Sequence, residues 1–240
     1  MAEKFDPTTV LEQKGQIVQF YHTISGAEVS FKAFLTSYTD SITPSWTPDV
    51  VFGRPDPIQM YSGTKRAVQI ALKVVASDEE EAQQNLVKTS TLTRMLYPEY
   101  SSVENANTIS KSPLLKIKFA NLIYDASRGP GGDVRTSGLL GAPTSFTWAP
   151  DIEQGFFDPS NRLYPKMIAI SIGLEVLHQH SLGWQRQQTN NDGTSDTAPR
   201  WGSDAALFPW SSGVQKANTQ ISNTTVQDIA LAGARWIMGS

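Results

Sequence analysis

The residues of this chain that could carry out chemistry are few and scattered. His178 and His180 form an H-x-H pair at the end of an apolar stretch, an arrangement that some metal sites use. No third ligand stands at a recognisable spacing, so an ordinary strand end is the favoured interpretation. A Ser-His-Asp triad is not excluded by residue counts, but no G-x-S-x-G elbow is present.

Three further stretches invite a chemical interpretation. The triplet Glu79-Glu80-Glu81 could be a carboxylate cluster, and Asp151, Glu153 and Asp158 could hold calcium, although their spacing is not that of an EF-hand. The glycine-rich run SRGPGGDVRTSG lacks the order of a phosphate-binding loop and is predicted to be a flexible loop. We therefore predict no catalytic residues, no cofactor and no metal, and a protein that is not an enzyme.

Composition narrows the class of protein further. The chain has 240 residues, a formal net charge of -3 and no cysteine, which excludes disulfides and thiolate chemistry. There is no global positive charge to hold nucleic acid, and the low charged fraction of 18% permits self-association. No apolar run is long enough to span a membrane, so we expect a chain that is made and stays soluble in a cytoplasm, with no membrane partner.

The elements that would position these residues are predicted to be mainly β, in an α+β chain with one well-marked helix. Residues 66–75 alternate between apolar and small or polar side chains, which indicates a half-buried strand. Ser77 is then expected to cap a helix, with Glu80 completing a capping box, and Pro98 to end it. The acidic triplet is explained by its place at the positive end of the helix dipole.

Other strands surround this unit. They are predicted at residues 16–23, 28–36, 113–124, 144–149 and 166–178, with the first two forming a hairpin. Residues 40–64 contain four prolines and two glycines, so we expect a long irregular connection there.

The strands predicted at residues 66–75 and 166–178 each have an unusual face opposite their apolar one. Small and weakly polar residues stand there in place of the large charged side chains of an ordinary solvent face. Such residues suit a surface that another chain approaches closely, or the wall of a channel. The candidates for this subunit or lumen surface are Ala67, Gln69, Ala71, Lys73, Met167, Ala169, Ser171 and Glu175.

The chain is predicted to divide at residue 183. Residues 1–183 would form the β domain with its N-terminal hairpin, and residues 184–240 an extended arm that ends in a short helix. The arm is polar and aperiodic but rich in tryptophan, and aromatic side chains often dominate docking energy. Its predicted anchors are Trp184, Trp201, Trp210 and Trp236.

Several strings, taken in order, resemble the tube and baseplate proteins of contractile-tailed bacteriophages. The resemblance spans roughly residues 29 to 184 and does not cover the arm. The strings are VSFKAFLTSYTDS, FGRPDPIQMYSGTKR, EAQQNLVKTSTLTRMLYPEY, PLLKIKFANLI, GLLG, GFFD and LYPKMIAISIGLEVLHQHSLGW.

The resemblance implies a tail-tube-like β-sandwich or barrel with one packed helix. Such proteins form hexameric rings whose strands join in a continuous barrel around a lumen. The ring links the spike hub to the tail tube, nucleates tube assembly and lets the genome pass without sequence-specific binding. Expected partners are further copies, the hub, the tube and possible sheath or wedge proteins, in a virion assembled in the host cytoplasm.

Two alternatives belong to other classes. One is a carbohydrate-binding tail-tip adhesin that uses exposed tryptophans as sugar platforms. The other, less favoured, is a cell-wall hydrolase that uses His178 and His180.

Overall fold

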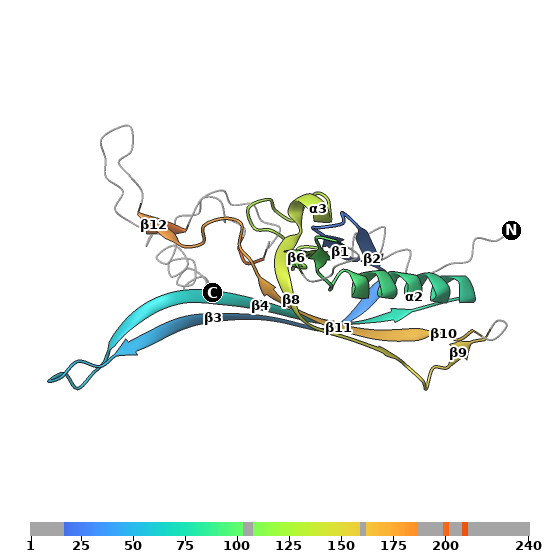
Figure 1. The fold of residues 1–240 in the computed structure, drawn as a ribbon, viewed down its shortest axis with the longest axis horizontal. Helices are drawn as coiled ribbons and strands as arrows, with labels where there is room; N and C mark the ends of the chain where they lie inside the picture. The colour runs from blue at the N-terminus through green and yellow to red at the C-terminus, as the bar shows by residue number, and fades with distance from the viewer. Residues whose placement is uncertain (1–16, 103–107, 159–161, 187–198, 202–207, 211–240) are drawn as a thin grey trace, which may run out of the picture.

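The computed structural model describes residues 17–102, 108–158, 162–186, 199–201 and 208–210, and it is mainly β, as the sequence predicts (Figure 1). Seven strands form one antiparallel sheet in the order β2-β1-β7-β8-β11-β4-β3. These strands are β1 (Val18–His22), β2 (Glu28–Phe31), β3 (Ala33–Asp49), β4 (Ile58–Val75), β7 (Leu115–Phe119), β8 (Leu139–Pro150) and β11 (Met167–Val176). The helices are α2 (Glu79–Arg94) and α3 (Val134–Ser137). Three short pairs complete the described elements: β5 (Glu99–Tyr100) with β6 (Ile109–Lys111), β9 (Phe156–Phe157) with β10 (Tyr164–Pro165), and β12 (Trp184–Arg186) with β13 (Pro199–Trp201).

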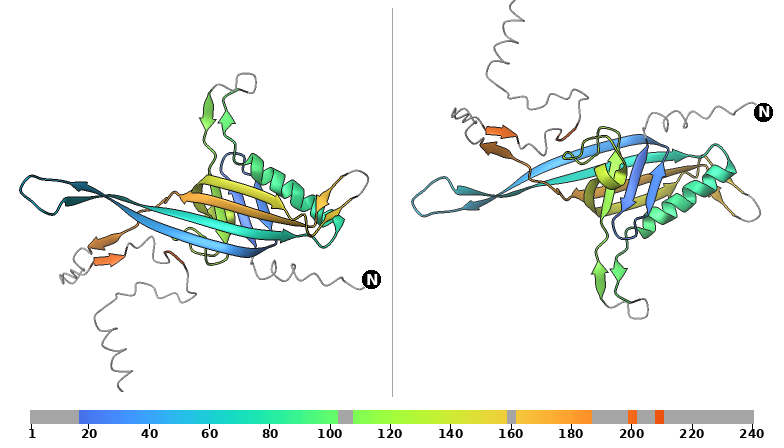
Figure 2. Two further views of the ribbon diagram at one scale, coloured as in Figure 1. Left: turned by 90° about the horizontal axis from the view of Figure 1, so that it is seen from below. Right: turned by 90° about the horizontal axis from the view of Figure 1, so that it is seen from above.

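The sheet folds over itself because β8 is shared by two halves. Its first residues pair with β7, and the rest of the strand pairs with β11. Figure 2 shows β1 and β2 lying across the long strands, so the two halves face each other as in a sandwich. Phe20 and Ile117 from one half share a buried cluster with Ile70 and Ile170 from the other.

A single chain does not close the predicted barrel. The edge strands β2 and β3 lie at opposite ends of the strand order, although only Lys32 separates them in the sequence. The sheet therefore stays open along both edges. The single strand predicted over residues 28–36 is in fact these two strands, and they belong to different halves of the sheet.

A large part of the core consists of the apolar residues that alternate along β4 and β11, as predicted. They are Val68, Ile70, Leu72 and Val74 on β4, and Ile168, Ile170, Ile172, Leu174 and Val176 on β11. Helix α2 contributes Leu92 to this core. Burial of each such side chain stabilises the fold by about 1.5–3 kcal/mol before entropy is counted.

The expected irregular connection over residues 40–64 is wrong. Strands β3 and β4 continue through most of it as a long hairpin, and only residues 50–57 form the turn (Figure 1). Two of the prolines, Pro44 and Pro48, lie within β3. Because β3 is an edge strand, proline there removes no hydrogen bond that a second neighbour would need.

Helix α2 forms as predicted, but its cap is one residue further along. Asp78 is the N-cap and accepts a hydrogen bond from the Glu81 amide at 2.8 Å. The Glu81 carboxylate in turn accepts from the Ser77 amide, also at 2.8 Å. The cap therefore uses Asp78 and Glu81, not Ser77 and Glu80, with the Glu81 carboxylate bound to the amide of the residue before the N-cap, and the acidic triplet stands in the first turn of the helix.

The remaining predictions differ in detail. The strand predicted over residues 113–124 ends at Phe119, because the chain turns at Ala120, whose φ is +44°. The glycine-rich loop contains the short helix α3. The predicted C-terminal helix lies outside the described residues. Neither helix in the described ranges is long and apolar enough to span a membrane.

Candidate assembly surface

Four strands, β3, β4, β11 and β8, carry the small polar face that the sequence predicts. Pairing aligns their side chains in rows across the sheet, on the side opposite the core. One row is Ser41, Ala67, Glu175 and Ala142; the next is Thr39, Gln69, Gly173 and Ser145; the third is Ser37, Ala71, Ser171 and Thr147. We call these rows the hydroxyl face.

The predicted subunit or lumen residues all lie on this side of the sheet. Ala67, Gln69, Lys73 and Ser171 are exposed, and Ala71, Met167, Ala169 and Glu175 are partly exposed. The sequence therefore identified a contiguous surface from two strands, and pairing extends it to β3 and β8.

Charge on the hydroxyl face is sparse. Lys65 Nζ lies 3.5 Å from Glu175 Oε1, and both side chains are largely exposed, so this pair contributes little to stability. At Gly173 an added Cβ would lie 2.6 Å from the Ser145 hydroxyl oxygen. The strands β11 and β8 shift register between Gly173 and Leu174, so a β-bulge or similar irregularity lies beside this glycine.

Both edges of this four-stranded unit are unpaired in the described part of the chain. Strand β3 pairs only with β4. Residues 142–150 of β8 pair only with β11, because β7 reaches no further than Gly141. Unpaired edges of this length are templates for pairing with another chain.

The outer part of the β3-β4 hairpin exposes apolar side chains. Trp46 and Tyr61 pair across the strands with their ring centroids 5.2 Å apart. The exposed large apolar side chains of the hairpin and its turn are Ile42, Trp46, Val50, Val51, Phe52, Ile58, Met60 and Tyr61. A projecting element with so many exposed apolar side chains marks an interaction site.

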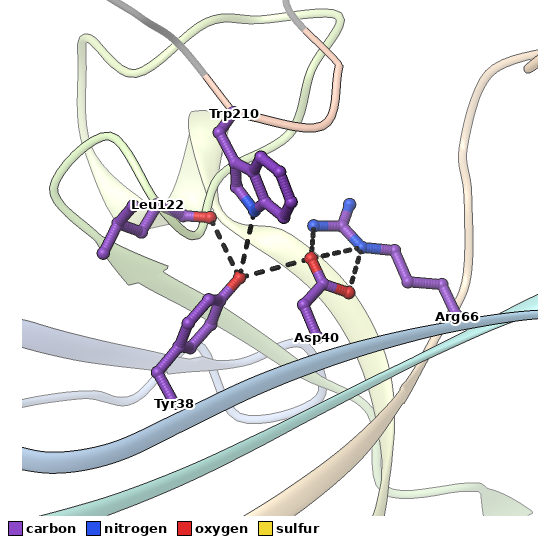
Figure 3. Close-up of polar contacts among 5 residues, drawn as sticks. All are labelled: Tyr38, Asp40, Arg66, Leu122 and Trp210. Carbon is purple, nitrogen blue, oxygen red and sulfur yellow. Dashed lines mark hydrogen bonds and ion pairs between the residues drawn. The ribbon is translucent and has the colours of Figure 1, made fainter.

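A buried ion pair stands where this hairpin leaves the core, on the core side of the sheet (Figure 3). Arg66 Nη2 lies 2.6 Å from Asp40 Oδ2, and Arg66 Nε lies 3.0 Å from Oδ1, with both side chains only 2% exposed. The Tyr38 hydroxyl lies 3.2 Å from Asp40 Oδ2 and 3.4 Å from the Leu122 carbonyl oxygen, and it can donate to either. Burial is the main cause that raises the pKa of Tyr38.

Sequence reasoning missed this cluster, although a signal was present. Arg66 and Asp40 both continue the core-facing alternation of their strands, Arg66 two residues before Val68 and Asp40 two residues after Tyr38. An opposite charge at a core-facing position in each of two consecutive strands predicts a buried pair. Because we expected an irregular connection over residues 40–64, Asp40 was not assigned to a strand, and its core-facing position could not be recognised.

The two histidines lie next to the cluster and hold no recognisable metal site. The rings of His178 and His180 are 6.1 Å apart, and His180 Nδ1 lies 3.3 Å from Asp125 Oδ1. Burial is the first cause that lowers the pKa of His178, and the charge of Arg66 adds to it. Within the described ranges, no group of three or more histidine, aspartate or glutamate side chains could hold a metal ion, the calcium candidates included.

The predicted arm anchors differ in their surroundings. The Trp210 indole N–H donates to the Tyr38 hydroxyl oxygen at 3.3 Å, and Trp201 stacks on Phe208 with ring centroids 5.6 Å apart. Trp184 meets the edge of Trp201 but is 63% exposed. Trp236 lies outside the described residues.

Comparison with known proteins does not indicate a family for this chain. No family model matches the sequence, and no curated protein is significantly similar to it.

Proposed function

We propose that this chain is a structural ring subunit of a contractile phage tail baseplate. The ring, which we expect to be hexameric, links the spike hub to the tail tube, nucleates the tube and encloses a channel for the genome. One observation supports this more than any other: a four-stranded unit with two unpaired edges has one apolar buried face and one small hydroxyl face.

Strand direction makes ring closure possible. Every pairing among β3, β4, β11 and β8 is antiparallel, so β8 runs opposite to β3. If the β8 edge of one copy meets the β3 edge of the next, the new pair is also antiparallel. An even number of strands therefore lets identical copies join head to tail into one continuous sheet, and closure removes every exposed edge.

The hydroxyl face suits the inner wall of the resulting barrel. Its side chains are small, and its few charges include the pair Lys65 and Glu175. A wall with little net positive charge gives DNA few phosphate contacts, so DNA can pass without being held. The exposed apolar side chains of the hairpin then serve as contacts to neighbouring copies or to the adjacent ring.

Cysteine cross-linking tests the proposed edge pairing. The chain has no cysteine, so introduced thiols are the only ones present. Thr39→Cys on β3 is combined in turn with Ser145→Cys, Thr147→Cys or Ala149→Cys on β8, because the register between copies is the unknown. Within one chain these positions are about 14 Å apart, three strand spacings, which is beyond the reach of a disulfide.

After oxidation of the assembled protein, one double variant should give a ladder of covalent oligomers that stops at the hexamer. Single-cysteine variants are matched controls, because a head-to-tail interface joins two different surfaces and a lone thiol meets no partner. Monomer alone in all three double variants would rule out pairing between β3 and β8.

One observation favours the adhesin as a second candidate. Trp184 is well exposed and stands at the edge of Trp201, as an aromatic sugar platform would. Trp201, however, already stacks on Phe208. Glycan-array binding that is lost in Trp184→Ala would favour the adhesin over the ring subunit.

A further inference from the structure

The long hairpin depends on its root, which we define as the layer of Tyr38, Asp40 and Arg66. In the register of β3 and β4, Asp40 lies opposite Val68 in the core, and Arg66 lies opposite Ile42, which is exposed. Beyond Arg66 no side chain of the hairpin is fully buried. A two-stranded ribbon is at best marginally stable alone in water, so the root must hold the hairpin in place.

A segment distant in sequence covers this root. The Arg66 guanidinium carbon lies 5.2 Å from the centroid of the Phe208 ring, within the range of a cation-π contact. The Trp210 indole donates to the Tyr38 hydroxyl oxygen, as Figure 3 shows. Phe208 also meets the edge of the His178 ring at 6.0 Å. The contacts thus engage β3, β4 and the chain that follows β11.

The cover stabilises the buried cluster because it supplies interaction partners to the charges and to the hydroxyl. Desolvation of both charges of a buried ion pair is costly, and it is offset only when the geometry is good and the remaining donors find partners. The Phe208 ring provides an electron-rich face to a desolvated guanidinium, and Trp210 adds a donor to the hydroxyl that faces Asp40.

We propose that residues 208–210 are a strap that locks the root of the long hairpin to the body of the protein. The strap makes the C-terminal arm and the hairpin one mechanical unit. A ligand that draws the arm away from the root releases the hairpin, and a partner that fixes the hairpin strengthens the attachment of the arm, since coupling between two sites is reciprocal. This inference concerns a single chain and goes beyond the ring proposed above.

Trp184 shows where such a ligand could act. It belongs to the same arm, contacts Trp201 and is exposed, whereas Trp201 in turn stacks on Phe208 of the strap. A partner that binds Trp184 thereby reaches the strap through two aromatic contacts. Binding to the arm would therefore change how firmly the hairpin is held, and the hairpin carries the exposed apolar side chains.

Hydrogen exchange of the full chain tests the strap. In the double variant Phe208→Ala/Trp210→Ala, amides of residues 41–43 and 63–66 should exchange about tenfold faster, the combined effect of one hydrogen bond and one cation-π contact. Amides of β11, in the core, should be unchanged. Tyr97→Ala is the matched control, because it removes an exposed aromatic side chain that follows α2, outside the arm and the hairpin, and it should leave the hairpin unchanged.

Two results would overturn the strap. One is unchanged exchange at the root in the double variant, and the other is equal acceleration in β11, which would mean a general loss of stability. If the double variant does not fold, Trp210→Phe keeps an aromatic ring at this position, although a smaller one, and deletes the indole N–H donor, and it should accelerate root exchange by about threefold. None of these outcomes depends on ring formation, so the strap and the ring can fail separately.

Discussion

The two halves of the β3-β4 hairpin share one ladder of hydrogen bonds but differ in what lies behind them. The inner half, residues 33–41 and 67–75, has a packed core on one side. The outer half, residues 42–49 and 58–65, exposes apolar side chains without any such layer. Pairing alone therefore does not explain the length of the hairpin. The inner half is stabilised by the core of the chain, whereas the outer half exposes apolar side chains of the kind that partners commonly cover.

The largest effect on the free energy of unfolding is expected at the boundary between the two halves of the hairpin. Arg66→Met leaves the Asp40 carboxylate buried and unpaired, which should lower the free energy of unfolding by about 3–5 kcal/mol. Combining it with Asp40→Leu removes both charges and should recover much of the loss. Urea denaturation of the four proteins in this cycle measures both terms. Equal losses in the single and double variants would show that the pair is not the critical feature of the boundary.

Matched truncations on one strand sharpen the comparison. Leu72→Ala in the inner half should cost about 2–5 kcal/mol, because Leu72 is 1% exposed and its loss leaves a cavity. Met60→Ala in the outer half should change the stability of the isolated chain by less than about 0.5 kcal/mol, since Met60 is exposed. Urea denaturation of both variants measures the two changes in the free energy of unfolding. A large loss in Met60→Ala would mean that the outer half already has an internal partner.

The aromatic pair tests how independent the outer half is. Trp46 and Tyr61 should couple by about 0.5–1.5 kcal/mol in a double-mutant cycle read from local hydrogen exchange of the hairpin. Global unfolding should be unaffected by either change. A shift of the global denaturation midpoint in Trp46→Ala would contradict the separation of the two halves.

The smallest expected effect is a dependence of stability on pH, through His178 beside the root and His22 at the end of β1. Burial lowers the folded-state pKa of His178 and of His22 below the ordinary value of 6.5. Below pH 6.5 the unfolded chain therefore takes up protons before the folded chain does. Stability should be complete above that pH, fall as the pH falls, and level off once the folded-state pKa values are passed. Denaturation midpoints of His178→Gln and His22→Gln should show a flatter pH profile.

The sequence predicted the parts of the fold that depend on local patterning. Alternation along β4 and β11 identified the core residues and the opposite face, because each strand presents its side chains with a period of two. The acidic triplet in the first turn of the helix was correctly explained as helix-start charge. The cap was wrong by one residue, since Ser77 and Asp78 are both acceptable caps and only backbone geometry chooses between them.

The parts of the fold that could not be predicted from the sequence depend on tertiary context. Pro44 and Pro48 argue against a strand unless that strand lies at an edge, and edge position is not visible in a single segment. The root cluster joins residues as far apart as Tyr38 and Trp210, and no local spacing could bring them together. The expected barrel does not form within one chain, because β2 and β3 lie at opposite ends of the strand order and stay unpaired with each other.

Cryo-electron microscopy of the chain, alone and purified with the proteins encoded beside it, is the decisive test of the proposed ring. We expect a hexameric ring with β3 of each copy paired to β8 of the next and with Thr39, Gln69 and Ser171 facing an open channel. A particle without a ring, or a ring whose apolar hairpins or helices α2 line the channel, would contradict it.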